Sequence, residues 1–167
     1  MASQNRKDII AALVSQIETE VTDLNLVTYD SDYYHSEGLS PGQYPACIIL
    51  DGPAQSGTMI CKTQELVMDL KARVIADIDT SDDEVRDFFE AIVDAVNTDI
   101  SLGETCLSCL WKSDELVSIW PSGTRKFMDV AFAVTYWRDF VIPARVFILQ
   151  EDEDYLLQET GDKIYSG

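Results

Sequence analysis

Two stretches of the chain place apolar residues at the three-to-four-residue spacing of one helix face. In the first, over residues 5–22, the apolar positions are Ile10, Leu13, Val14, Ile17 and Val21. In the second, from Asp82 to about Asn97, they are Val85, Phe88, Phe89, Ile92 and Val96. Ser81 precedes the second stretch and Glu84 follows three residues later, which is the spacing of a capping box. The pattern therefore predicts two amphipathic helices.

Other apolar residues follow the two-residue period of a β-strand. In the clearest example, residues 66–77, apolar side chains alternate with mostly charged ones that include Asp69, Lys71 and Arg73. Further strands are predicted at residues 26–29, 45–50, 105–111, 116–120 and 126–138. Asp51-Gly52-Pro53 is expected to end the strand 45–50, and residues 58–63 are expected to pair back onto it.

The order helix, strands, helix, strands predicts an α+β fold. We expect an antiparallel sheet of mixed-length strands with two amphipathic helices packed on one face, because each helix has one apolar stripe and the sheet has one apolar side. The charged side of the sheet then meets water or another chain. Its candidate interface residues are Asp69, Lys71 and Arg73, whose mixed signs would set the register between subunits.

The end of the chain departs from this pattern, so we expect a single α+β domain over residues 1–139 and a C-terminal extension over residues 140–167. Residues 140–149 are apolar apart from Arg145, and Pro143 is unfavourable in a central strand. An exposed apolar stretch of this kind favours packing against an adjacent subunit. Its candidate interface residues are Phe140, Ile142, Phe147 and Ile148.

A long loop over residues 30–43 is a second candidate partner-binding element, because loops of this length in a compact domain are often functional. Its apolar residues are Tyr33, Tyr34 and Leu39. His35 lies in the same loop, where a solvated side chain is a better explanation than a catalytic one, since no nucleophile or orienting acid can be assigned to it.

The net charge of the chain excludes some classes of function. The chain of 167 residues has 30 acidic and 12 basic residues, a formal net charge of −18. This balance argues against binding to a nucleic-acid backbone or to an anionic membrane surface, both of which attract basic faces. The longest apolar run, residues 9–14, is far shorter than the ~20 residues that span a bilayer. We therefore expect synthesis in the cytoplasm and no membrane partner.

The sequence indicates no catalytic centre, metal or cofactor. Cys106 and Cys109 have the spacing of a redox or zinc motif, but in a β-type run their sulfurs would point to opposite faces. A zinc site would also need a second ligand pair, which the other cysteines do not form. Buried or edge thiols are therefore the favoured interpretation, and the acidic clusters are best explained as a solvated surface.

The element order resembles that of the tail terminator, or tail completion, proteins of long-tailed bacteriophages. The resemblance covers residues 6–138. It is carried by the opening helix, the run Tyr44-Pro45-Ala46-Cys47-Ile48-Ile49-Leu50, the strand 65–76, the capped helix 82–96 and the long strand 129–137.

The resemblance implies a structural protein without catalysis: a homo-oligomeric ring, usually a hexamer, that stops tail-tube polymerisation and offers a surface to the head. The implied partners are further copies of the chain, the tail tube protein and a head-closure or neck protein. DNA would only pass through an acidic lumen. The implied location is the tail or neck of the virion, after assembly in the host cytoplasm.

Two alternatives stay open. Another neck or head-completion ring protein would have the same kind of small α+β subunit. A small intracellular enzyme or adaptor, whose site the sequence does not reveal, is the alternative from a different class. A ring in negative-stain images would separate the first two interpretations from the third.

Overall fold

The computed structural model describes residues 4–29, 39–60, 63–119 and 123–139, and the backbone of three short strands further on. The elements before the second long helix are α1 (Arg6–Glu20), β1 (Leu26–Tyr29), the short 3-10 helix η1 (Pro41–Gln43), β2 (Ala46–Ile60) and β3 (Thr63–Asp77). The elements that follow are α3 (Asp82–Thr98), β4 (Ser108–Asp114), β5 (Ser118–Ile119) and β6 (Arg125–Asp139).

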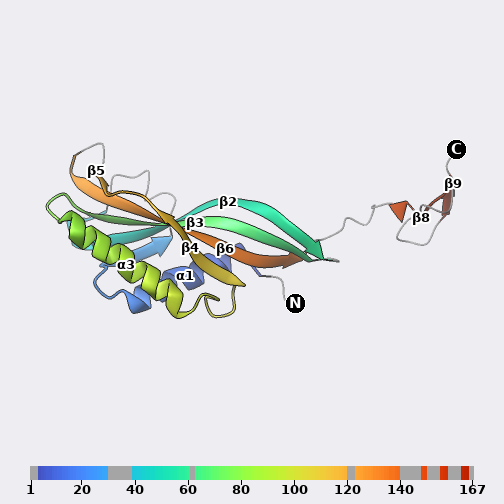
Figure 1. Cartoon of the computed structure of the whole chain (residues 1–167), viewed down its shortest axis with the longest axis horizontal. Helices are drawn as coiled ribbons and strands as arrows, with labels where there is room; N and C mark the ends of the chain where they lie inside the picture. Colours follow the sequence, from blue (N-terminus) through green and yellow to red (C-terminus); the bar gives the residue numbers. More distant parts are fainter. Residues whose placement is uncertain are drawn as a thin grey trace.

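The main sheet has the strand order β1-β2-β3-β6-β4, and β5 also pairs with β6. Both helices cover the same face of this sheet (Figure 1), which confirms the predicted α+β fold. One pair differs from the expected antiparallel arrangement, because β1 runs parallel to β2, with Leu26 opposite Ala46. Parallel neighbours require a long connection, and residues 30–45 supply one.

The C-terminal extension contributes a sheet of its own. Its strands β7 (Ile148–Leu149), β8 (Tyr155–Leu157) and β9 (Lys163–Tyr165) pair with one another in that order. They are absent from the main sheet, as expected for an extension beyond the domain.

The core lies between the two helices and the inner face of the sheet, where alternate residues of β3 and β6 are buried. Its largest fully buried side chains from the helices and these two strands are Ile9, Leu13, Ile17, Val85, Ile92, Met68, Leu70, Val74 and Phe132. Gln16 of α1 joins the two helices, because its Nε2 donates to the carbonyl oxygens of Ala95 (2.7 Å) and Asp99 (3.2 Å). These bonds satisfy carbonyls that the end of α3 leaves without helical partners.

Helix α3 begins with the predicted capping box. The N–H of Glu84 donates to Ser81 Oγ (3.2 Å), and the N–H of Ser81 donates to Glu84 Oε2 (2.9 Å). These bonds satisfy two of the N–H groups that a helix start leaves open. The N–H of Ser81 is also the main reason that the pKa of Glu84 is lowered.

Strand β2 is much longer than predicted. Asp51-Gly52-Pro53 does not end it, and the expected pairing of residues 58–63 with 45–50 is wrong, since Ile60 instead lies opposite Thr63 in a hairpin with β3. The register shifts between Asp51 and Ala54 and again between Ser56 and Met59, so bulges absorb the irregular residues. Proline is tolerated there because this part of β2 is a sheet edge.

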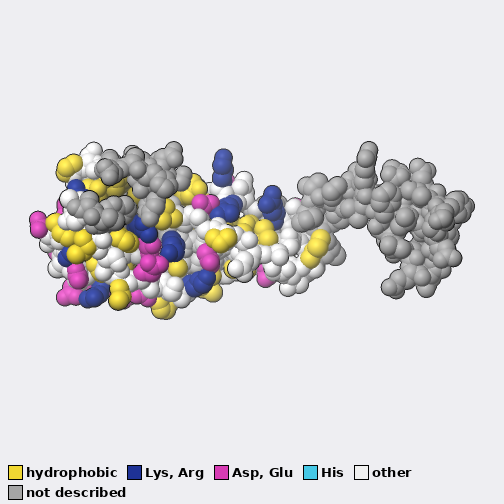
Figure 2. Space-filling model, turned by 90° about the horizontal axis from the view of Figure 1, so that it is seen from above, with side chains coloured by type: hydrophobic (Ala, Val, Ile, Leu, Met, Phe, Trp, Pro, Cys, Tyr) yellow, Lys and Arg dark blue, Asp and Glu magenta, His cyan; other side chains and the backbone are white. Residues whose placement is uncertain are grey.

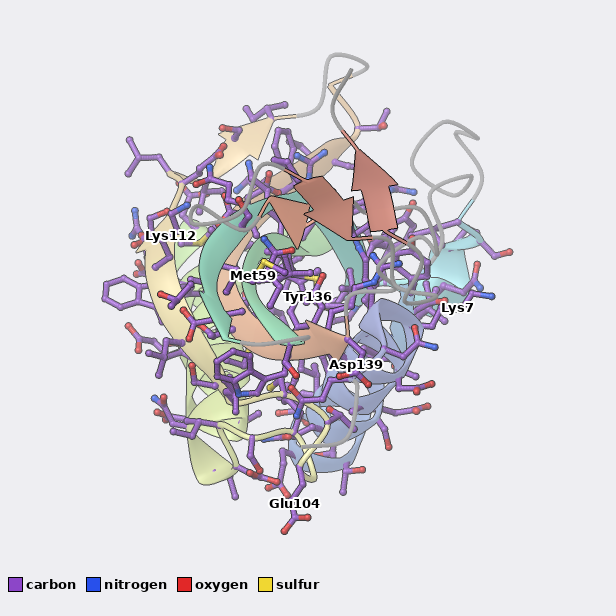
Figure 3. All side chains as sticks on the ribbon, turned by 90° about the vertical axis from the view of Figure 1, so that its right-hand side faces the viewer. Lys7, Met59, Glu104, Lys112, Tyr136 and Asp139 are labelled. Atoms are coloured by element: carbon purple, nitrogen blue, oxygen red, sulfur yellow. The ribbon has the colours of Figure 1, made fainter. Side chains whose placement is uncertain are left out.

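Strands β2, β3 and β6 continue past the helices as a three-stranded projection (Figure 1). We call this projection the β-arm and define it as residues 54–60 of β2, 63–68 of β3 and 134–139 of β6. Residues 53–59 of β2 are all exposed. Viewed along the β-arm, the strands curl, and Met59 and Tyr136 lie inside the curl (Figure 3).

Candidate interaction surfaces

The predicted interface residues Asp69, Lys71 and Arg73 lie together on the sheet face opposite the helices, where they form a ladder of ion pairs. Lys112 Nζ lies 2.8 Å from Asp69 Oδ1, and Lys71 Nζ lies 2.8 Å from Glu115 Oε1 and 3.6 Å from Asp129 Oδ2. The hydrogen bond to Glu115 is the main reason that the pKa of Lys71 is raised. Positive and negative side chains accordingly mix over this part of the molecule (Figure 2).

Two alanines of β6 make this ladder possible. Ala133 lies opposite both Asp69 and Leu110, and Ala131 lies opposite both Lys71 and Ser113. A methyl group in the middle strand leaves room above it, so long side chains from β3 and from the β4 side reach each other across β6.

Arg73 departs from the expected exposed face, because it is only 8% exposed and its partner Asp129 is 2% exposed. Arg73 Nε and Nη2 donate to the two oxygens of Asp129 at 2.5 and 2.6 Å. The guanidinium also lies over the ring of Phe127, 4.7 Å from its centroid. A buried charge requires such pairing, so the role of Arg73 is structural. Of the predicted interface residues on this face, only Asp69 and Lys71 are accessible.

The β-arm is a second candidate surface, and its β2 side is open. Strand β1 covers β2 only from Ala46 to Ile49, so the edge of β2 beyond Asp51 has no neighbouring strand in the described part of the chain. The opposite edge is different. The N–H of Gln4 donates to the carbonyl of Trp137 (2.8 Å), and the N–H of Trp137 donates to Gln4 Oε1 (2.9 Å). Gln4 thus occupies the β6 edge of the β-arm.

Arg6 fixes the base of the β-arm, at the first bulge of β2. Its Nη2 lies 2.7 Å from Asp51 Oδ2 and donates to the carbonyl of Gly52 at 2.5 Å. Glycine is required at position 52, because a Cβ there would lie 2.9 Å from the carbonyl oxygen of Asp69. We call this contact the Arg6 clamp, and it joins the start of α1 to the point where β2 leaves the body.

A third candidate surface is apolar and follows the opposite edge of the sheet. Leu110 and Trp111 of β4 are each 49% exposed, and Leu116 and Ile119 nearby are 81% and 61% exposed. The sequence pattern places these residues in strands but not in an interface, since exposure of an edge strand cannot be inferred from its own alternation. A group of large apolar side chains at one edge is typical of an interaction site.

The remaining predicted interface residues are not brought to these surfaces. Leu39 lies just before η1 and is half-buried. Tyr33, Tyr34, Phe140, Ile142 and Phe147 lie outside the described residues, as does the side chain of Ile148, whose backbone belongs to β7. His35 is also outside them.

The cysteine interpretation is confirmed in one respect and corrected in another. Cys106 and Cys109 are both buried in the same core, with Cys47, and are free thiols. The expectation of opposite faces was wrong because β4 begins only at Ser108, so the strand alternation does not reach Cys106. Burial raises the pKa of Cys47 and Cys109 to about 12 and that of Cys106 to about 11, which makes these thiols poor nucleophiles.

One hollow of about 570 Å³ opens at the end of the sheet near the start of α3. Its lining residues are Pro45, Asp77, Ile78, Asp79, Thr80, Glu84, Phe88 and Arg125. Arg125 pairs with Asp77 at 2.7 Å and lies over the ring of Tyr44. The hollow is therefore lined by carboxylates and by a guanidinium that already has partners. It is a charged surface hollow, and its described lining residues do not pair a nucleophile with a general base.

Among the residues that the structure describes, no group of histidine, cysteine and acidic side chains is arranged to hold a metal ion. In the same residues no helix is both long and apolar enough to cross a lipid bilayer. Comparison of the chain with protein-family models and with curated proteins finds no match.

Proposed function

We propose that this protein is the tail terminator of a long-tailed bacteriophage, a structural subunit that forms a ring, ends the tail tube and meets the head or neck. The observation that carries the proposal is the β-arm. Its β2 strand is exposed from residue 53 to residue 59 and has an open edge, so this strand contributes little to the subunit's own core. Open edges of this kind recruit strands from other chains.

The charge of the chain supports the same function. Each copy has a formal net charge of −18, so a ring of several copies would be strongly acidic, and we propose that its inner wall carries part of this charge. Such a wall repels the phosphate backbone, and DNA would pass through without adhering. The element order from residue 6 to residue 138, which resembles that of tail terminators, is the second support.

The test is to add the purified protein to tail tubes that are polymerising from tail tube protein, and to image the products by negative stain. The proposal expects rings in the free protein, a ring at one end of each tube, and tubes that stop growing. Rings that leave tube length unchanged would instead favour another neck or head-completion protein. A protein that stays monomeric at all concentrations and leaves the tubes unaltered would contradict the proposal.

A further inference from the structure

We propose that copies of this chain join head to tail by strand addition, the open β2 edge of one β-arm pairing with the β4 edge of the next copy. The contact consists of residues 54–59 of β2 on one side and residues 110–114 of β4 on the other. This pairing would be the contact between subunits of the proposed ring, and as a ring contact it rests on the proposed tail terminator function.

The first support is that these two edges are open in the same molecule. Beyond Asp51 no strand of the described part lies beside β2, and its residues 53–59 are exposed. Strand β4 ends the sheet on the other side. Its first part is covered, because the N–H of Cys109 donates to the carbonyl of Ile100 (2.7 Å), and the following residues 110–114 are exposed. Each edge therefore offers a short row of backbone groups for pairing.

The second support is charge, which favours a second copy as the occupant. Residues 52–60 include no charged side chain in a chain whose formal net charge is −18. Acidic side chains are correspondingly few along the β-arm (Figure 2). A basic partner would be drawn to the acidic surfaces of the protein. A second copy is equally acidic, and it meets the smallest electrostatic repulsion where it approaches through an uncharged edge.

The third support is the apolar strip on the receiving side. Leu110 and Trp111 alternate on β4 and are each 49% exposed, and Met59 of the β-arm is 52% exposed. A strand added beside β4 would cover part of both β4 side chains, which lie on opposite faces of the sheet. Backbone bonds would give the pairing its direction, and these side chains would give it apolar contact.

The contact is heterologous, because the two edges are different and lie apart on the molecule. In Figure 1, β2 follows the upper margin of the β-arm and β4 descends on the lower side. The other margin of the β-arm is occupied by Gln4, through its bonds to Trp137. A contact between two unlike patches generates rings or open filaments and not a closed twofold dimer.

Cross-linking tests the pairing directly in the full chain. The background variant is Cys61→Ser, since Cys47, Cys106 and Cys109 are buried and do not compete for a thiol reagent. Ser56→Cys and Ser113→Cys place one exposed thiol on each edge, and a short bifunctional maleimide tolerates a shift in register. The doubly substituted chain should give a ladder of covalent multimers, a mixture of the two single variants should stop at dimers, and each single variant alone should match the background.

Several outcomes overturn the inference. Self-linking of the Ser56→Cys variant alone would indicate a twofold contact between β2 edges. Absence of covalent multimers from the double variant, whether the protein assembles or not, would exclude the β2–β4 contact. If rings still cap tail tubes in that case, the proposed function stands while the inference fails. A covalent ladder without tube capping would support the β2–β4 contact and count against the proposed function.

A charge variant gives an independent readout. Ser56→Glu together with Thr58→Glu adds two negative charges to the open edge, where both side chains are exposed, and should weaken self-association at least tenfold while the circular dichroism spectrum stays unchanged. The matched control, Ala11→Glu with Thr19→Glu, adds the same charge on the exposed side of α1 and should associate like the wild type. Equal association of both variants would contradict the pairing.

Discussion

At the scale of single residues, Arg73 and Asp129 form a buried ion pair that joins β3 to β6. Both side chains are almost fully buried on the face without helices, and two hydrogen bonds join them. A buried pair of this kind contributes little net stability, but breaking it leaves an uncompensated charge in the protein. The role of Arg73 is therefore mainly structural, although it lies on a charged strand face.

Replacing Asp129 by Ala should strongly destabilise the protein, because Arg73 then remains buried without its carboxylate. We expect the free energy of unfolding, measured by urea denaturation, to fall by about 3–5 kcal/mol. The double variant Asp129→Leu with Arg73→Met removes both charges and should recover most of this loss.

The control for that experiment is Glu115→Ala, which removes the exposed partner of Lys71 (side chain 59% exposed). Exposed pairs contribute about 0–1 kcal/mol, so this variant should unfold close to the wild type. Equal losses for Asp129→Ala and Glu115→Ala would show that burial of the Arg73 pair has no energetic consequence.

Residue patterns predicted the charged face but not this pair. The alternation along residues 66–77 correctly placed Asp69, Lys71 and Arg73 on one side of β3. Whether a side chain on that side is exposed depends on residues far away in the sequence, since Asp129 and Phe127 reach Arg73 only through the pairing of β3 with β6. For the same reason, the sequence did not predict that Leu110 and Trp111 are exposed at the edge of the sheet.

At the scale of elements, α3 is the one whose start the sequence specifies most fully. The capping box joins Ser81 and Glu84 through two reciprocal bonds, and three acidic residues occupy the first turn. Replacing Ser81 by Ala should lower the free energy of unfolding by about 1 kcal/mol.

The same motif predicts a pH dependence. The pKa of Glu84 is lowered in the folded protein, mainly by the N–H of Ser81, so folding favours its ionised form. This contribution is complete above the pKa of the unfolded chain and disappears as the pH falls through the lower folded value. In thermal melts, Glu84→Gln should therefore lose stability relative to wild type at neutral pH and converge with it in acid. A difference that stays constant from neutral pH into acid would contradict this role of Glu84.

Local signals sufficed for both helices, whereas the length of β2 and the direction of β1 required tertiary context. Asp51-Gly52-Pro53 has the composition of a turn, but bulges and the Arg6 clamp let the strand continue through it. The parallel pairing of β1 depends on where residues 30–45 return the chain, and no periodicity in those four strand residues encodes it.

At the scale of the whole molecule, net charge and open edges act against each other. Copies with a formal charge of −18 repel one another, and the proposed contact must overcome that repulsion. Raising the salt from about 0.05 to about 0.5 M shortens the range of the repulsion from over 10 Å to a few ångström. Sedimentation velocity should therefore show stronger self-association at high salt.

This salt dependence separates two kinds of contact. An interface built on the exposed charges of Asp69 and Lys71 would pair opposite signs across subunits and would weaken as salt rises. A contact between the uncharged β2 edge and the apolar side chains Leu110 and Trp111 of β4 should strengthen instead. Self-association that decreases with salt would thus favour the charged face over the β-arm.

If copies form the proposed ring, the Arg6 clamp has a consequence for its size. In a head-to-tail contact nothing in the two edges dictates how many copies close a circle; the angle between one body and the next decides it. In the proposed contact this angle would depend on where the β-arm leaves the body, at Asp51 and Gly52, which Arg6 holds against the start of α1. In the proposed ring, loosening this joint is expected to change the number of copies while leaving the paired edges intact, because Asp51 and Gly52 lie outside the proposed β2–β4 contact.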